Sequence, residues 1–309
     1  MAVDLSPIDE SLLATIANLH GMPKGAYNIR RNGELVTRNS SANIEIATKD
    51  DVPGIDIFIK DGTRDETCYI PVIVTEAGVK DLVYNTFHIG KDCDVNIVAG
   101  CGIHNSCEEQ SEHDGVHTFY IGKNSRVKYA EAHYGEGDPD GVRILNPVTK
   151  VFMEENSYCE MDLTQMGGVT SSIRDTEAHL EAGAKMLVTE KLLTDGSQTV
   201  ESNQVFELTG ENSSVQVVSR SVAKDDSRQV FSPLVIGRAA CRGHVQCDSI
   251  IMGNGRVKSV PAIEADHEDA MLFHEAAIGK IAGEQLIKLQ TLGLTAEEAE
   301  AEILEDFLS

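Results

Sequence analysis

The chain has 309 residues, of which 41% are hydrophobic, so it can bury a substantial core and is not expected to be disordered. Its 26 Lys and Arg residues against 50 Asp and Glu residues give a formal net charge of −24. That charge argues against nucleic-acid and anionic-membrane surfaces, which need basic patches. No apolar run approaches the roughly 18 residues of a membrane span, and the first residues lack the basic segment of a secretory signal. We therefore expect a cytoplasmic protein with no nucleic-acid or membrane partner.

The N-terminal segment, residues 1–25, is predicted to contain a short helix. Ser6 is the expected N-cap and Pro7 fits the first turn. The expected apolar face comprises Leu12, Leu13, Ile16 and Leu19. Gly21 is expected to end the helix.

From Ala26 onward the pattern indicates β-strands. The stretch "RNGEL" is typical of a tight hairpin, and Ile55, Ile57 and Ile59 alternate with residues expected to face outward.

A repeat runs through the middle of the chain, in which a polar turn is followed by a small residue and then usually an apolar one. The small residues are Cys93, Ser125, Ser157, Ala184, Ser213, Ala240 and Ala270. Their spacings of 27 to 32 residues predict a solenoid of stacked coils, and no helical period accompanies them. We therefore predict a mostly β fold, a parallel or mixed β-helix over residues 26–278, with a stacked β-sandwich as the alternative. The two longest spacings contain predicted loops at 100–117 and 133–141.

The C-terminal segment, residues 279–309, is predicted to be helical again. A first helix is expected to stop at Gly293, and Thr295 with Glu298 forms the capping box of a second. These helices are expected to cap the open end of the solenoid, to serve as a docking surface for a partner, or both.

The seven cysteines are an odd number and too few for a disulfide framework, so we expect reduced thiols, some of them reactive or metal-binding. The sequence has no phosphate-binding loop, dinucleotide-binding fingerprint or nucleophile elbow. The chain therefore shows no nucleotide site of its own and no sign of serine hydrolase chemistry.

Cys247 and His274 are 27 residues apart, which is about one coil. Residues one coil apart lie on neighbouring strands, about 4.8 Å from each other, where a thiolate and an imidazole can share an iron or zinc ion. Glu275 adds a carboxylate, but neighbouring strand residues point to opposite faces, so its use requires a bend or a second subunit. The alternative is that Cys247 is an inert core residue.

A second group of candidate ligands lies in the predicted loop "GCGIHNSCEEQSEHDGVH". It comprises Cys101, His104, Cys107, His113 and His117. This loop is expected either to bind zinc or iron or to be solvated without a ligand. If Cys101 is partly exposed among histidines, its pKa is expected to be lowered, which would make it a nucleophile or a sulfur acceptor.

The stretches "QCDSIIMG", "VPAIEA" and "HEAAIGKIAGEQLIKLQTLGLTAEEAEAEIL" resemble the C-terminal signature of the SufB/SufD family of iron–sulfur cluster assembly scaffolds. The match is dense from Gly243 to Leu308 and extends more loosely back to "AGCGIH" and "HTFYIGKNSRVKYAEAH". The resemblance implies a right-handed β-helix flanked by helical segments. It also implies a scaffold rather than an enzyme, pairing through the β-helix and binding a SufC-type ABC ATPase through residues 279–309, with ATP used only by that partner.

The resemblance assigns roles to residues. A transient iron–sulfur cluster at the interface of paired subunits is expected to be held by Cys247, His274 and Glu275. Sulfur from a donor is expected to enter at Cys101, with His113 downstream, and to move along the β-helix toward Cys247. This leaves His104, Cys107 and His117 as candidates for a secondary metal site or relay.

Some positions depart from the family pattern. Phe273 stands where an acidic residue is usual, and the turn after "CDSIIMG" lacks a second cysteine. Because Cys247 and Glu275 are both present, we expect a homodimer rather than an obligate pair with a SufD-like paralogue. The alternatives are a SufD-like structural partner that carries no cluster and a β-helical metalloenzyme with zinc at 101–117.

Overall fold

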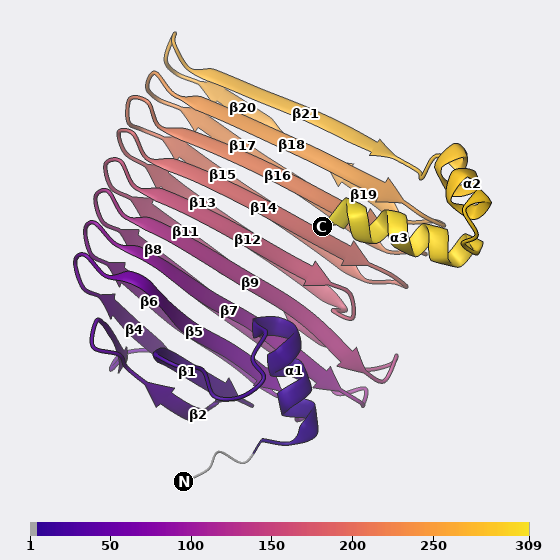
Figure 1. Ribbon diagram of the computed structural model, residues 1–309, viewed down its shortest axis with the longest axis horizontal. Helices are drawn as coiled ribbons and strands as arrows, with labels where there is room; N and C mark the ends of the chain where they lie inside the picture. The colour runs from indigo at the N-terminus through magenta and orange to yellow at the C-terminus, as the bar shows by residue number, and fades with distance from the viewer. Residues whose placement is uncertain (1–4, 309) are drawn as a thin grey trace.

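The computed structural model describes residues 5–308; residues 1–4 and 309, the outer ends of the predicted terminal segments, lie outside the described residues. The described chain is a β-solenoid of about 8 turns with one N-terminal and two C-terminal helices. The coils stack in chain order from one end of the molecule to the other (Figure 1). The predicted β-helix is thus confirmed, and the sandwich alternative is wrong.

Two sheets form the walls of the solenoid. Sheet A comprises β1 (Ala26–Arg31), β2 (Glu34–Asn39), β5 (Arg64–Val74), β7 (Asp94–Asn105), β9 (Arg126–Gly137), β12 (Tyr158–Met166), β14 (Lys185–Thr194), β16 (Ser214–Ala223), β18 (Arg242–Ile251) and β21 (Met271–Gly279). Sheet B comprises β3 (Ile44–Thr48), β4 (Gly54–Ile59), β6 (Lys80–Ile89), β8 (Ser111–Ile121), β10 (Arg143–Leu145), β11 (Val148–Met153), β13 (Ser171–Leu180), β15 (Thr199–Leu208), β17 (Arg228–Gly237), β19 (Arg256–Ser259) and β20 (Ala262–Ala265). The β1–β2 and β3–β4 pairs are antiparallel, and the other pairs within residues 5–308 are parallel.

The repeated small residue lies immediately before a strand of sheet A, where it is buried beneath the turn. This holds for Cys93, Ser125, Ser157, Ala184 and Ser213, each at most 2% exposed. In the next coil the position belongs to Cys241, because Arg242 pairs with Ser214, so the choice of Ala240 is wrong by one residue. The turn before β18 spans four residues (238–241) and the turn before β16 spans five (209–213), which shifts the alignment.

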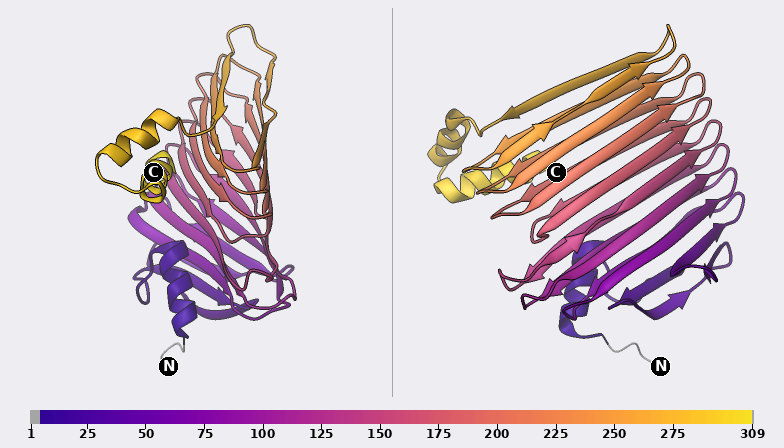
Figure 2. Two further views of the ribbon diagram at one scale, coloured as in Figure 1. Left: turned by 90° about the vertical axis from the view of Figure 1, so that its right-hand side faces the viewer. Right: turned by 180° about the vertical axis from the view of Figure 1, so that it is seen from behind.

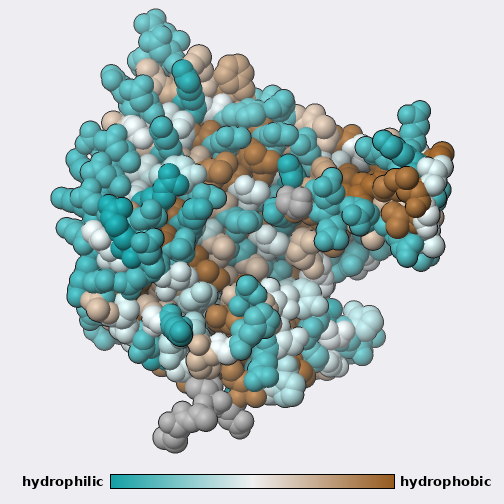
Figure 3. All heavy atoms as spheres, viewed as in Figure 1, coloured by the Kyte–Doolittle hydropathy of each residue, from teal (hydrophilic) through white to brown (hydrophobic). Residues whose placement is uncertain are grey.

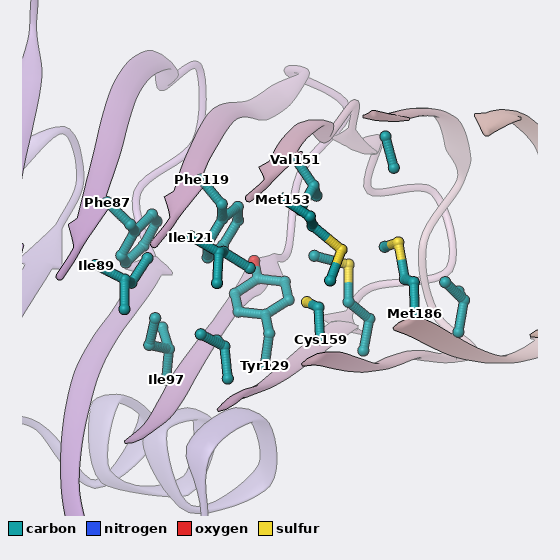
Figure 4. Close-up of a cluster of buried hydrophobic side chains, with 14 of the residues drawn as sticks. Phe87, Ile89, Ile97, Phe119, Ile121, Tyr129, Val151, Met153, Cys159 and Met186 are labelled. Carbon is teal, nitrogen blue, oxygen red and sulfur yellow. The ribbon is translucent and has the colours of Figure 1, made fainter. Parts of the chain in front are cut away.

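The interior is divided lengthwise into an apolar half and a polar half. The apolar half contains Phe87 and Phe119 from successive coils of sheet B and Tyr129 opposite them on sheet A, followed by Met153, Cys159 and Met186 (Figure 4). The rings of Phe87 and Phe119 stack with their centroids 4.3 Å apart. Such ladders arise because residues one coil apart occupy equivalent inward positions. The predicted inward face of Ile55, Ile57 and Ile59 belongs to this half and is confirmed.

Helix α1 (Pro7–Ala17) packs on the outer face of sheet A, against β7 and β9 (Figure 1). Ser6 caps it as predicted, but the helix ends at Ala17 with Asn18 in the left-handed conformation, before Gly21. At Gly102 on β7 the helix leaves little room for a side chain, because a Cβ there would lie 3.0 Å from Leu12 Cδ2.

The C-terminal helices α2 (Gly283–Thr291) and α3 (Ala296–Leu308) lie beside the solenoid (Figure 2). Thr295 and Glu298 form the predicted capping box. Helix α3 packs on β16, where Lys224 Nζ lies 3.7 Å from Glu300 Oε1. The expected cap over the open end is therefore wrong: β21 remains an edge strand. None of the helices formed by residues 5–308 is long and apolar enough to cross a membrane.

Candidate functional site

The predicted loop at 100–117 is mostly strand. Residues up to Asn105 continue β7, residues from Ser111 begin β8, and only residues 106–110 connect them. The loop prediction failed because glycines and polar residues in this stretch occupy inward positions and positions beneath α1. A solvated loop is excluded for most of this segment.

This arrangement separates the candidate residues of the segment. Cys101, His113 and His117 are at most 7% exposed and line one internal cavity. His104 lies on the opposite face of β7, where its Nδ1 is 3.3 Å from Glu136 Oε1, and Cys107 is exposed on the connection. The five residues therefore do not form a single ligand set.

Cys101 is buried, with 1% of its surface exposed. Burial raises the pKa of the Cys101 thiol well above its ordinary value, and Asp81, Glu131 and Asp114 add to the effect. The expected partly exposed cysteine with a lowered pKa is therefore wrong, because the interior desolvates the thiolate and surrounds it with carboxylates. Cys101 rests as a neutral thiol.

The cavity beside Cys101 has a volume of about 10 Å³, enough for about one water molecule. Its polar lining comes from both sheets: His113 and His117 on β8, and Glu131 and His133 on β9. The Tyr129 hydroxyl donates to Glu131 Oε1 at 2.8 Å and lies 2.7 Å from His117 Nδ1.

The polar lining continues into the next coils through a buried arginine. Arg174 on β13 donates to His133 Nδ1 at 2.9 Å and to Glu131 Oε2 at 3.2 Å. Its Nε lies 3.8 Å from Glu190 Oε1 on β14. All four side chains are at most 5% exposed.

Glu190 connects this cluster to the last coils. Its Oε1 accepts from Ser202 at 2.7 Å and its Oε2 accepts from Ser219 at 3.0 Å. Ser219 pairs in register with Cys247, which is 1% exposed. We call the whole set the polar row: Cys101, His113, His117, Glu131, His133, Arg174, Glu190, Ser202, Ser219 and Cys247.

Between its two cysteines, the polar row crosses five strand intervals of sheet A, from β7 to β18. At about 4.8 Å per interval the row is about 24 Å long. Both cysteines thus face one continuous buried polar strip, at opposite ends of it.

The sequence analysis missed the middle of this row, namely Glu131, His133, Arg174 and Glu190. The signal was present as charged or polar residues at inward positions of alternating strands, for example in "KYAEAHY". Alternation alone, however, does not say which of the two faces is buried.

The second candidate set lies on the last two strands of sheet A. Cys247 pairs with Ala276, and His274 pairs with Val245, so Cys247 and His274 are diagonal rather than direct neighbours. The coil here is 29 residues long, because 276 − 247 = 29, so the 27-residue gap falls two residues short of register. Glu275 points outward, as the alternation required, and its Oε1 lies 2.7 Å from His244 Nε2.

His274 has a free ligand atom. Its Nε2 is buried and has no hydrogen-bond partner within residues 5–308. Burial lowers the pKa of His274 more than the adjacent Glu275 raises it, so the imidazole is neutral, the form that binds metals. Within the described chain no three His, Cys, Asp or Glu side chains converge on one point that could hold a metal ion.

Comparisons with known proteins find similar sequences over most of the chain. The family model described as "SUF system FeS cluster assembly, SufBD core domain" matches residues 74–307. The matched span includes both cysteines of the polar row and the C-terminal helices, while α1 and β1 to β4 precede it.

Several archaeal proteins named "Iron-sulfur cluster assembly SufBD family protein" are similar over most of the chain. The protein from Pyrococcus horikoshii is 28% identical over 298 residues, covering 95% of this chain and 84% of the relative. That from Methanocaldococcus jannaschii is 27% identical over 229 residues, 73% of this chain and 71% of the relative. That from Archaeoglobus fulgidus is 23% identical over 276 residues, covering 89% and 73%.

Proposed function

Because the chain belongs to the SufBD family of iron–sulfur cluster assembly proteins, we propose that it is a scaffold that receives sulfur at Cys101 and assembles a cluster at Cys247. The observation that carries this proposal is the polar row, a line of buried polar side chains with one thiol at each end. Hydrogen bonds and an ion pair link its middle members, from Glu131 through Arg174 and Glu190 to Ser219. A structural core has no need of Glu190 and Arg174, because charged groups are costly to bury.

On the sulfur side, the Cys101 thiolate attacks the outer sulfur of a persulfide on a donor protein. A bond forms from Cys101 to that sulfur while the donor's sulfur–sulfur bond breaks, and the donor cysteine leaves as a thiolate. No oxidant or reductant is consumed. The polar row then supplies donors and acceptors along the path toward Cys247.

On the iron side, Cys247 and His274 provide a thiol sulfur and a free imidazole nitrogen from the same inner face. Two protein ligands leave an iron–sulfur cluster incompletely held, so the nascent cluster, which is the cargo, requires ligands from a second subunit. Glu275 lies on the outer face of the edge strand, so it can bind the cluster only if that subunit covers or bends β21.

The second subunit is expected to add to the open edge at β21. This strand carries exposed apolar side chains, with Met271 44%, Phe273 62% and Ile278 42% exposed. Unpaired edges of this kind are templates for strand addition. We propose a second copy of this chain as the partner, with a SufD-like paralogue as the alternative.

The C-terminal helical segment 279–309 is proposed to dock a SufC-type ABC ATPase, which would use ATP on behalf of the scaffold. Apolar side chains gather over α2, in one of several hydrophobic patches on the face drawn in Figure 3. Ile287 is 61% exposed and Leu292 is 75% exposed. Contiguous exposed apolar patches are typical of protein contact surfaces.

The iron side is tested by anaerobic reconstitution with iron and sulfide, followed through the charge-transfer absorption of the cluster. Cys247→Ser is expected to lose this absorption. Cys241→Ser is the matched control, because Cys241 is also buried and occupies the repeat position that serine fills in three other coils. Equal absorption in Cys247→Ser and wild type would contradict the ligand role and favour a SufD-like partner without its own cluster.

The sulfur side is tested with a persulfide-loaded donor in place of free sulfide. Cys101→Ser is expected to abolish assembly from the donor but to retain assembly from free sulfide. Cys93→Ser is the control, because Cys93 occupies the repeat position that serine fills in other coils. Loss of both activities in Cys101→Ser would make Cys101 a ligand instead of an acceptor.

A further inference from the structure

Behind the Cys101 cavity, side chains from three strands form a hydrogen-bonded chain. Arg30 on β1 donates from Nη2 to Asp81 Oδ1 on β6 at 2.9 Å. The other carboxylate oxygen, Asp81 Oδ2, lies 3.1 Å from His113 Nδ1 on β8. The side chains of Asp81 and His113 are each 6% exposed, and the two residues are register neighbours. The Asp81 and His113 side chains are therefore largely shielded from water.

The hydrogen bond from His113 to Asp81 fixes which nitrogen of His113 carries the proton. A carboxylate can only accept, so Nδ1 donates to Asp81 and the lone pair of neutral His113 lies on Nε2. This nitrogen points toward the cavity, since a Cβ on the cavity residue Gly115 would lie 3.5 Å from it. No hydrogen-bond partner of Nε2 occurs among the residues that the structure describes.

The other groups around Cys101 are less suited to act as a base. His117 Nδ1 is engaged by Tyr129, and His133 Nδ1 accepts from Arg174. Glu131 is already paired with that arginine. Asp114 has no specific contact with Cys101 and acts on it only through its charge. His113 is thus left with an available lone pair at the cavity that Cys101 also lines.

A buried thiol needs such a base. Burial and the carboxylates of Asp81, Glu131 and Asp114 raise the pKa of Cys101, so the thiolate required for attack is scarce near neutral pH. For Asp81, burial acts to raise the pKa, but the hydrogen bonds and charges of His113 and Arg30 outweigh it and lower the pKa. Asp81 therefore remains a carboxylate and supports a positively charged His113.

We propose that Asp81, held by Arg30, is a positioning residue that orients His113 as the base for Cys101. The inference rests on the proposed role of Cys101 as sulfur acceptor. The proton moves from Cys101 Sγ to His113 Nε2, and the thiolate attacks the outer sulfur of a persulfide. The departing thiolate then takes the proton from the imidazolium. Asp81 neither gains nor loses a proton, and Arg30 brings the β1–β2 hairpin into the site.

The test uses the full chain and inorganic polysulfide as the sulfane-sulfur probe. Persulfide on the Cys101 peptide is trapped and quantified by mass spectrometry across a pH series. Asp81→Asn is expected to slow persulfide formation by about 100-fold at neutral pH, within the range of general-base effects. The rising limb of the rate–pH profile is expected to move to higher pH, because attack would then depend on ionisation of the thiol without a base. Asp81→Glu, which keeps the carboxylate, is expected to restore part of the rate and the wild-type limb.

Asp56→Asn is the matched control. Asp56 forms a similar pair with His88 on the same sheet, but on its outer face, with Oδ1 lying 3.6 Å from His88 Nε2. This variant is expected to behave as wild type, and a slowing equal to that of Asp81→Asn would overturn the proposal.

The outcomes separate the inference from the function on which it rests. If wild type forms no persulfide at Cys101, the proposed acceptor role itself fails. If wild type reacts and Asp81→Asn has the wild-type rate and the wild-type pH dependence of that rate, only the positioning role fails. Equal slowing at every pH in Asp81→Asn and Asp81→Glu, with a lower unfolding midpoint, would reduce Asp81 to structural support and also overturn the proposal.

Discussion

At the scale of single residues, the polar row makes the stability of the protein depend on pH. Burial lowers the pKa of His133 to about 3 from an ordinary 6.5, so it stays neutral in the folded chain. For Glu131, burial would raise the pKa, but His133, Arg174, His117 and the Tyr129 hydroxyl lower it to about 2 from an ordinary 4.5. Both shifts mean that acid favours the unfolded state, which binds the protons that the folded state refuses.

We predict that the free energy of unfolding falls as the pH drops through 6.5 and falls more steeply below 4.5, where Glu131 adds its proton. Each group contributes up to about 1.4 kcal/mol per pH unit. Urea titrations from pH 7.5 to 4 measure this slope. His133→Gln is expected to flatten it between pH 6.5 and 4.5, whereas His179→Gln, on the outer face between Glu177 and Glu207, is not. Equal slopes in all three proteins would contradict the prediction.

At the scale of elements, α1 depends on the bare backbone of β7. Gly102→Val is expected to push α1 outward, because even a Cβ would lie 3.0 Å from Leu12 Cδ2. Overpacking of this kind costs about 1–3 kcal/mol. A lower urea midpoint and faster proteolysis after Asn18 would report it. Gly279→Val, with open space around its Cα, is the control, and an unchanged midpoint in Gly102→Val would show that α1 adapts freely.

The exposed side of α2 provides the second prediction at this scale. Ile287→Asp and Leu292→Asp are expected to weaken binding to a SufC-type ATPase by at least about tenfold, since buried apolar anchors dominate interfaces. Binding is measured by titration calorimetry, with thermal melting unchanged. Leu82→Asp is matched in type and is 45% exposed on β6, far along the chain from α2. Wild-type affinity in both α2 variants would exclude α2 from the docking surface.

How far the sequence predicts this architecture differs between its elements. The coil period, the Ile55–Ile59 strand and the Thr295–Glu298 capping box were predictable because each depends on residues close together in the chain. The strand character of 100–117 was not, because its glycines serve the packing of α1, a contact with residues more than 80 positions earlier.

The candidate site was less predictable than the fold. The resemblance identified its two terminal cysteines, whose roles stay predictions. The charged middle of the polar row escaped because Arg174 and Glu131 are 43 residues apart, and only the stacking of coils brings them together. The error over the Cys101 pKa has the same origin, since exposure is a property of the assembled interior.

At the scale of the whole molecule, β21 is an edge strand at the C-terminal end of the solenoid. We predict that Met271→Lys combined with Phe273→Lys abolishes self-association, because charged edge residues oppose strand pairing. Sedimentation analysis is expected to show a dimer for wild type and a monomer for the variant. Tyr120→Lys, 47% exposed on the outer face of sheet B, is the control. A wild-type chain that dimerises only with a SufD-like protein would contradict the homodimer.

The coils themselves are of two sizes. The first two intervals between the repeated residues, from Cys93 to Ser125 and on to Ser157, are 32 residues long, and the later ones, with Cys241 in its correct place, are 27 to 29. Strands β7, β8 and β9 are accordingly 11 or 12 residues long, against 10 for β14 to β18. The coil that carries Cys101 is therefore longer than the coil that carries Cys247.

The size of a coil and the length of the solenoid are consequently independent in this fold. Duplicating one short coil would lengthen the separation of Cys101 and Cys247 by about 4.8 Å while leaving the coils around both residues unchanged. Trimming the long coils would instead reduce the perimeter around Cys101 and leave the separation of the thiols as it is. In a solenoid of this kind, the separation of two buried residues and the size of the coil around each of them can be altered separately.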